Sequence, residues 1–144
     1  MLTPKELELI ATILRRDVIE MTTAAGSGHP SSCLSAADIM ATLWFNEMFF
    51  DPHNPHHPNN DQFVMSKGHA APLYYAVLKH VGCANYDLLS LRKHGSLLEG
   101  HPTPRVSRWI PAATGSLGQG LGIGCGCALG CKMQKSTARA DVLL

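Results

Sequence analysis

The stretch QFVMSKGHAAPLYYAVLKHVG, Gln62–Gly82, indicates the fold class of this chain. Its first four residues, Gln62–Met65, are a short β-prone run, which predicts a buried strand. A glycine-containing turn, Ser66–His69, comes next, and apolar residues then recur at helical spacing until Gly82. Strand, turn and helix in this order are typical of an α/β fold with a parallel sheet, whose ligands bind beyond the carboxyl ends of the strands.

Two helices are predicted before this strand. Thr3, followed by Pro4 and by Glu6 at the third helical position, has the pattern of a capped helix start, and the helix is predicted to end at Gly26. Residues 51–61 are rich in Pro, Asn and His without periodicity, which predicts a surface loop.

The second of these helices is predicted to begin at Ser35. Asp38, three residues later, completes the pattern of a capping box, and Leu34 and Ile39 are spaced as a hydrophobic staple. Apolar residues as far as Met48 predict a mostly buried body for this helix.

Three further elements are predicted towards the carboxyl end. Residues 85–93 predict a short helix stopped by Gly95, the glycine-rich stretch 112–132 predicts a helix, and 140–144 begins like a strand. Because only two strands are visible, we expect the sheet to be completed outside this chain. Residues 1–144 are therefore predicted to form a single, incomplete domain.

The glycine-rich stretch contains no familiar nucleotide motif. It has neither a strict G-x-G-x-x-G after a strand nor a G-x-x-x-x-G-K-[ST]. Gly118, Gly122, Gly126 and Gly130 are four residues apart, which predicts one bare helical face that another backbone approaches closely. The turn Gly115–Gly118 places unpaired backbone N–H groups at a helix start, which suits an anion or a polar ring edge. A helix start that needs only close packing is the alternative.

Composition and charge exclude several classes of protein. Twelve Lys and Arg against 11 Asp and Glu give a net charge of +1, without the basic excess that nucleic-acid binding requires. No apolar run approaches the roughly 20 residues of a membrane span. The first residues, MLTPKELELI, lack a signal-peptide pattern, so we expect a cytoplasmic protein with reduced cysteines.

Two groups of potential metal ligands are assigned other roles. Cys125, Cys127 and Cys131 contain no C-x-x-C pair and are predicted to be small buried apolar residues. The histidines of the 51–61 loop lack a spaced acid or cysteine and are predicted to be solvated. No metal ligand is therefore predicted within the chain.

Three histidines share one local pattern. His29, His69 and His101 each follow a glycine and lie on connections between predicted elements, where folds commonly present functional side chains. Histidine donates, accepts or transfers a proton near neutral pH, which suits a substrate with several hydroxyls. His80 and His94, near helix ends, are predicted to be surface residues.

Four segments resemble the amino-terminal part of transketolases, in the same order and at similar intervals. They are GSGHPSSCLSAADIMATLWF, DQFVMSKGHAAPLYYAVL, EGHPTP and ATGSLGQGLGIGCG. The resemblance implies a partial thiamine diphosphate-binding fold. A 1-deoxyxylulose-5-phosphate synthase shares some of these features, but SKGHAAP and GHPTP look like transketolase.

The resemblance also implies a role for each matching residue. His29 and His101 resemble the catalytic, substrate-binding histidines that contact the donor sugar. The positions that resemble cofactor-binding residues are Ser32, His69, Gly115, Ser116 and Leu117.

The function implied is transfer of a two-carbon ketol unit from a ketose phosphate to an aldose phosphate. In the family, Mg²⁺ is held by a Gly-Asp-Gly motif and an Asn that would follow Leu144, and a catalytic Glu belongs to another domain. We therefore expect this chain to require a further transketolase segment or subunit, in a homodimer or a split-subunit assembly. Alone, it is expected neither to hold the cofactor tightly nor to be active. A catalytically silent relative that acts only through a partner is the alternative.

Overall fold

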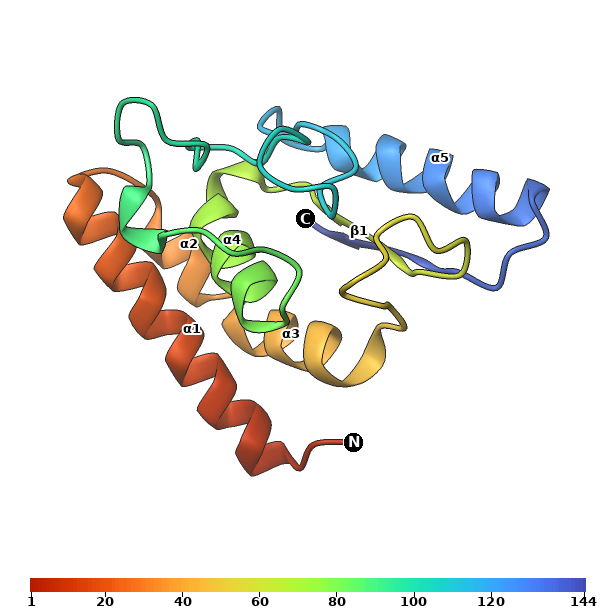
Figure 1. The fold of residues 1–144 in the computed structure, drawn as a ribbon, viewed down its shortest axis with the longest axis horizontal. Coiled ribbons are helices and arrows are strands. Elements are labelled where there is room, and N and C mark those ends of the chain that lie inside the picture. The colour runs from red at the N-terminus through yellow and green to blue at the C-terminus, as the bar shows by residue number, and fades with distance from the viewer.

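The computed structural model describes every residue of the chain, 1–144. It confirms an α/β architecture in which helices flank a parallel sheet (Figure 1). The elements are α1 (Pro4–Ala25), α2 (Pro30–Leu34), α3 (Ala37–Thr42), β1 (Gln62–Met65), α4 (Ala71–His80), α5 (Gln119–Met133) and β2 (Ala140–Leu143). None of these helices combines the length and the apolar character that crossing a membrane requires.

The two strands of the sheet have different environments on their two faces. They pair parallel and in register, with Met65 opposite Leu143. Phe63 and Met65 belong to the core formed with the helices α1, α3 and α4. Val142 lies on the other face, against α5. Because successive side chains of a strand point to opposite faces, one pair of short strands joins two helical layers.

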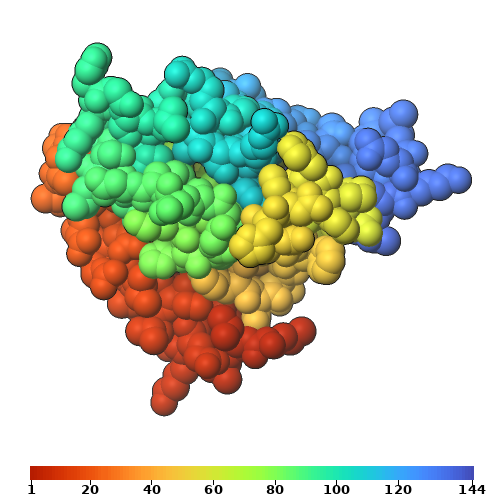
Figure 2. All heavy atoms as spheres, in the orientation of Figure 1, coloured from red at the N-terminus to blue at the C-terminus, as the bar shows by residue number.

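Two long connections lie side by side on the surface. The loop of residues 51–61 (yellow) adjoins the segment of residues 102–113 (teal) in Figure 2. Arg108 Nη1 of the second lies 3.5 Å from His56 Nε2 of the first. The 102–113 segment is also tied to the interior, because the buried Tyr74 hydroxyl donates to the Trp109 carbonyl at 2.6 Å.

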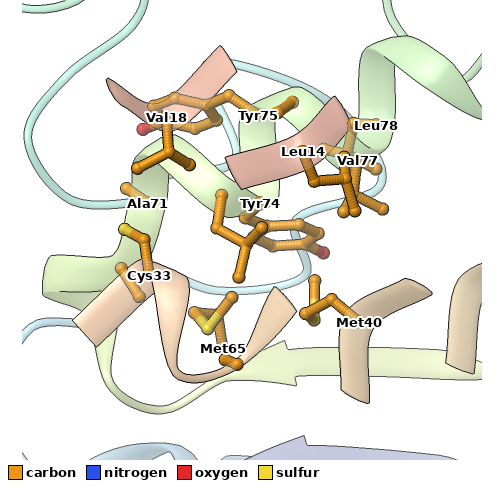
Figure 3. Packing of buried hydrophobic residues seen from close by; sticks show 14 of the residues in the cluster. Leu14, Val18, Cys33, Met40, Met65, Ala71, Tyr74, Tyr75, Val77 and Leu78 are labelled. Carbon is orange, nitrogen blue, oxygen red and sulfur yellow. The ribbon is translucent and has the colours of Figure 1, made fainter. Parts of the chain in front are cut away.

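The hydrophobic core is assembled from α1, α3, α4 and one face of β1. Leu14 of α1, Met40 of α3, Met65 of β1 and Tyr74 of α4 are at most 1% exposed and gather in Figure 3. Nearly the whole of α4 is buried, because it lies between α1 and the loops that follow it. This core fixes the ends of β1 and α4, from which the turn with His69 projects.

The first helix forms as predicted. Thr3 Oγ1 accepts from the Glu6 backbone N–H, and the Glu6 carboxylate accepts from the Thr3 N–H, so the capping box is complete. Gly26 ends the helix in the left-handed conformation, with φ of 58°. The next turn, which carries His29, is thus held at a fixed place.

The predicted helix start at Ser35 is wrong. Pro30 opens α2 earlier, Ser35 ends it, and α3 begins only at Ala37. The Asp38 carboxylate pairs with Arg15 of α1 instead of capping its own helix. Ile39 is 54% exposed and is not part of a buried staple. The helical layer ends in a π-helical turn, Leu43–Glu47.

The predicted helix over residues 85–93 is also wrong, since only the 3₁₀ turn Leu88–Ser90 forms. Asp87 caps that turn through the Leu89 N–H, and Arg92 then adopts a left-handed φ of 55°, which no α-helix accommodates.

The helical face predicted from Gly118, Gly122, Gly126 and Gly130 is not the face of α5 that another backbone approaches. A Cβ at Gly118, Gly122, Gly126 or Gly130 would meet nothing within 4 Å. The close approach falls on another face of α5, where a Cβ at Gly120 would lie 2.5 Å from Ser66 Cβ and one at Gly124 would collide with Val142. The spacing of glycines predicts a bare face, but only the position of the sheet selects the face that is packed.

The three cysteines of α5 are less buried than predicted. Cys125 is exposed, and Cys127 and Cys131 are half-buried. Much of α5 beyond its contact with the sheet carries exposed apolar side chains such as Leu121 and Leu129.

Candidate functional site

His29 and His69 meet although they are 40 positions apart in the chain. His29 precedes α2, and His69 lies in the turn between β1 and α4. Their ring centroids are 5.2 Å apart, at an interplanar angle of 64°. The turn with His69 follows the carboxyl end of β1, the edge at which α/β folds bind ligands.

Ser32 joins the same cluster from the first turn of α2. Its Oγ lies 2.8 Å from His69 Nε2, within hydrogen-bonding distance. Lys67 donates from Nζ to the Ser32 carbonyl at 3.0 Å. The hydroxyl, the imidazole and an ammonium group thus occupy one small region at the end of β1.

His101 reaches the site through the turn that begins at Gly115. A Cβ at Gly115 would lie 2.9 Å from His101 Cδ2, so the imidazole packs directly on the backbone of this turn. The Thr114 N–H donates to the Pro102 carbonyl at 3.3 Å, which holds the two segments together. Only a residue without a side chain allows this contact.

The turn that precedes α5 is anchored to the carboxyl end of β1. The buried Thr114 hydroxyl donates to the Met65 carbonyl at 2.6 Å, and the Gly120 N–H donates to Ser66 Oγ at 3.2 Å. A Cβ at Gly68 would lie 2.6 Å from the Thr114 carbonyl carbon. The His69 turn and the Gly115 turn are therefore packed backbone against backbone.

Residues 115–118 present open hydrogen-bonding groups. None of their four backbone N–H groups donates a hydrogen bond within the chain. The side chain of Ser116 is exposed without a partner, and Leu117 is 74% exposed. Adjacent free N–H groups with one apolar side chain suit a ligand that has both an anionic group and a flat ring.

The cluster is electropositive. Partial burial lowers the pKa of His69 below its ordinary value of 6.5. The charges of His29, Lys67 and His101 lower this pKa further, in that order. His69 therefore favours its neutral form, in which one ring nitrogen donates and the other accepts.

The structure brings together five of the seven residues assigned from the sequence, and the other two, Ser116 and Leu117, follow Gly115 in the same turn. The seven are His29, Ser32, His69, His101, Gly115, Ser116 and Leu117. The other histidines lie elsewhere: His53, His56 and His57 are in the 51–61 loop, and His80 Nε2 lies 2.6 Å from the buried Asp17 carboxylate. His80 is thus a paired residue between α4 and α1, which its position at a helix end does not predict.

No three His, Cys, Asp or Glu side chains lie close enough together to hold a metal ion. A cavity of about 610 Å³ is lined by His56 and by residues of the 104–111 segment, and it includes none of the seven site residues. The histidine cluster is an open surface with His29 and His101 exposed.

Sequence reasoning misses three residues that shape the site: Lys67, Arg92 and Thr114. Lys67 is two residues before His69, and Thr114 directly precedes Gly115. This closeness in sequence to predicted site residues is the only feature that could have pointed to them. Arg92 lies outside every motif, yet its Nη1 donates to Ser27 Oγ at 2.8 Å, next to the His29 turn.

Comparison with known proteins identifies the family of this chain. A family model described as transketolase, thiamine diphosphate binding domain, matches residues 7–141. Transketolase of Homo sapiens is 52% identical over 136 residues, which cover 93% of this chain and 22% of that protein. Transketolase-like protein 2 of Mus musculus is 54% identical over 121 residues, covering 83% of this chain and 19% of that protein.

Solved structures support the same conclusion. Transketolase from Leishmania mexicana superposes with a TM-score of 0.81 at 34% identity, over 85% of this chain and 19% of that one. Transketolase from Campylobacter jejuni gives 0.81 at 35% identity, over 88% and 20%. The fold and the matching family model thus define a thiamine diphosphate-binding domain, and the chain belongs to the transketolase family. It spans about a fifth of the length of these relatives.

Proposed function

We propose that this chain forms the cofactor-facing part of a transketolase, which transfers a two-carbon ketol unit from a ketose phosphate to an aldose phosphate. The observation that carries the proposal is the meeting of His29, His69 and His101 at the turn before α5. Three imidazoles from separate connections have no common structural task there, because the core is complete without them.

The residues present fit thiamine diphosphate. The free N–H groups of 115–118 suit a polar ring edge or an anionic group, and the exposed Leu117 side chain suits the face of a ring. His69 and Ser32, joined at 2.8 Å, and the nearby Lys67 add donors and positive charge for the diphosphate region. Thiamine diphosphate, when bound, stabilises the carbanion required for breaking a carbon–carbon bond beside a carbonyl.

His29 and His101 are proposed to handle the protons and hydroxyls of the sugar. Both imidazoles are exposed on the face where the turns meet, so a substrate reaches them without rearrangement of the core. Ketol transfer requires a proton to leave a hydroxyl and later to return, and imidazoles exchange protons near neutral pH. His101 is held by its contact with the Gly115 backbone, which limits the orientations of its ring.

No group of three His, Cys, Asp or Glu side chains gathers in this chain to hold a metal ion such as Mg²⁺. We place the Mg²⁺ ligands and the catalytic Glu in other parts of the assembly.

A split-subunit assembly has one specific observation in its favour. A 6-deoxy-6-sulfo-D-fructose transketolase subunit from Clostridium sp. (strain MSTE9) is 38% identical over 129 residues, which cover 89% of this chain and 47% of that protein. A relative whose name describes a subunit supports the proposal that this chain works with a partner chain, and dimers with sites at an interface fit the same requirement.

The test is co-expression of the chain with a segment that supplies the rest of a transketolase, followed by an assay of ketol transfer. We expect transfer by the assembly, none by the 144-residue chain alone, and a loss of about 10²-fold or more in kcat for His101→Ala. His53→Ala, in the remote loop, is the matched control and should retain full activity. Turnover by the isolated chain, or an assembly indifferent to His101→Ala, would contradict the proposal.

A further inference from the structure

Arg92 has an unusual backbone conformation close to the site. It is one of two residues other than glycine with a positive φ, at 55°. Its N–H donates to the Leu98 carbonyl at 2.8 Å, which closes the 92–98 loop between the buried Leu91 and Leu98. A long side chain held in the left-handed region is disfavoured, so the surrounding structure imposes this conformation.

The Arg92 guanidinium bridges the two segments that carry the proposed catalytic histidines. Nη1 donates to Ser27 Oγ at 2.8 Å, two positions before His29. The rest of the group lies against Gly100, next to His101, where an added Cβ would be 2.6 Å from Arg92 Cζ and Nε. The guanidinium therefore packs against the backbone of Gly100, and a side chain at this position would collide with it.

No carboxylate pairs with Arg92, and Glu99, the adjacent acid, pairs with Arg105 at 3.5 Å. The position of the guanidinium is thus set by Ser27 and Gly100 rather than by an ion pair. Tyr75 supports the same segment from beneath, since its hydroxyl lies 3.0 Å from the carbonyls of both Glu99 and His101.

We propose that Arg92 is a positioning residue, whose guanidinium ties the Ser27–His29 segment to the Gly100–His101 segment and thereby fixes the spacing of the two proposed catalytic histidines. Their catalytic role rests on the proposed function, but the positioning itself does not. A wide, rigid group with several donors suits this bridge, because one nitrogen donates to Ser27 while the rest of the group packs against Gly100.

The experiment measures the imidazole Cε1–H signals of the ¹³C-labelled full chain by NMR, assigned by single His→Gln variants. In Arg92→Gly the strained φ is relieved and the bridge is lost. We expect the His29 and His101 signals to shift together, with those of His53 and His57 in the remote 51–61 loop unchanged and the melting temperature equal to or above that of the parent chain. Arg92→Lys should restore the signals in part, because an ammonium group reaches Ser27 but does not cover Gly100.

Lys93→Ala is the matched control, because it removes the same charge from the neighbouring exposed position. It should leave both histidine signals in place. If Arg92→Gly leaves His29 and His101 unchanged, or if Lys93→Ala shifts them equally, Arg92 is not a positioning residue. These results are independent of cofactor binding, so failure here is distinct from failure of the transketolase proposal.

Discussion

His69 is the residue whose chemistry the structure defines most closely. Its Nε2 lies 2.8 Å from Ser32 Oγ, and three cationic or imidazole side chains surround it. Because burial and these neighbours disfavour the imidazolium ion, the folded state holds His69 neutral at a pH at which the unfolded chain is already protonated.

This depressed pKa predicts the direction of one pH effect. The folded pKa of His69 lies below 6.5, so the unfolded chain binds more protons in the window between the two values. The stabilisation contributed by neutral His69 is therefore complete above pH 6.5 and is lost as the pH falls through that window towards the folded value. We expect His69→Gln to reduce the acid dependence of the free energy of unfolding, and NMR titration to place the His69 midpoint below 6.5 in the parent chain. A midpoint at or above 6.5 would contradict this assignment.

Two threonines provide a matched pair of substitutions. The Thr114 hydroxyl donates to the Met65 carbonyl at 2.6 Å, whereas the buried Thr103 Oγ1 has no partner. Thr114→Val should lower the free energy of unfolding by about 1–2 kcal/mol, because a buried carbonyl loses its donor. Thr103→Val should be neutral or slightly stabilising. Urea unfolding measures both, and equal losses would show that the Thr114 bond does not anchor the turn.

The local sequence predicts some of the residues of the site and not others. Each histidine of the Gly-His pattern stands in a short motif, so its place on a connection is visible without the fold. Lys67 and Arg92 act on partners 35 and 65 positions away, Ser32 and Ser27 respectively, and no local pattern contains such a pairing.

At the scale of elements, α5 contains glycines in two different environments, one packed against the sheet and one open to solvent. Gly124 is packed against Val142 of β2, whereas a Cβ at Gly122 would meet nothing within 4 Å. Gly122→Ala should stabilise the chain by about 0.5–1 kcal/mol through helix propensity alone. Gly124→Ala should destabilise it by about 1–3 kcal/mol, because the new methyl group displaces Val142 from the sheet. Thermal unfolding of the two variants measures these effects. If both substitutions stabilise the chain, the face of α5 with Gly124 is not the face packed against the sheet.

Elements are predicted well where local chemistry determines them. The capping box of α1, from Thr3 and Glu6, and the strand β1 depend on neighbouring residues and are confirmed. The helix start at Ser35 is wrong because Pro30 opens a helix earlier in the chain, and Asp38 pairs with Arg15 of another helix. The packed face of α5 also depends on the sheet, not on the helix itself.

At the scale of the whole molecule, the parallel pairing of β1 with β2 brings the site together. The Ser66 N–H donates to the Leu143 carbonyl at 2.8 Å, so the turn after β1 is tied to the end of β2. The α/β class and the placement of ligands at the carboxyl ends of strands are predictable from the order of elements. The distances among the imidazoles are not, because they depend on where three loops cross.

The most direct measurement is an NMR titration of the ¹⁵N- and ¹³C-labelled chain with thiamine diphosphate, with inorganic phosphate as the matched control. We predict weak binding, in which the backbone amides of Gly115–Gly118 and the imidazoles of His29, His69 and His101 shift along one curve with a common dissociation constant, whereas phosphate perturbs at most a subset of them. Shifts confined to the His56 and Arg108 region, or a turn and histidines that stay unchanged while other residues respond, would contradict the assignment of this surface as the cofactor site.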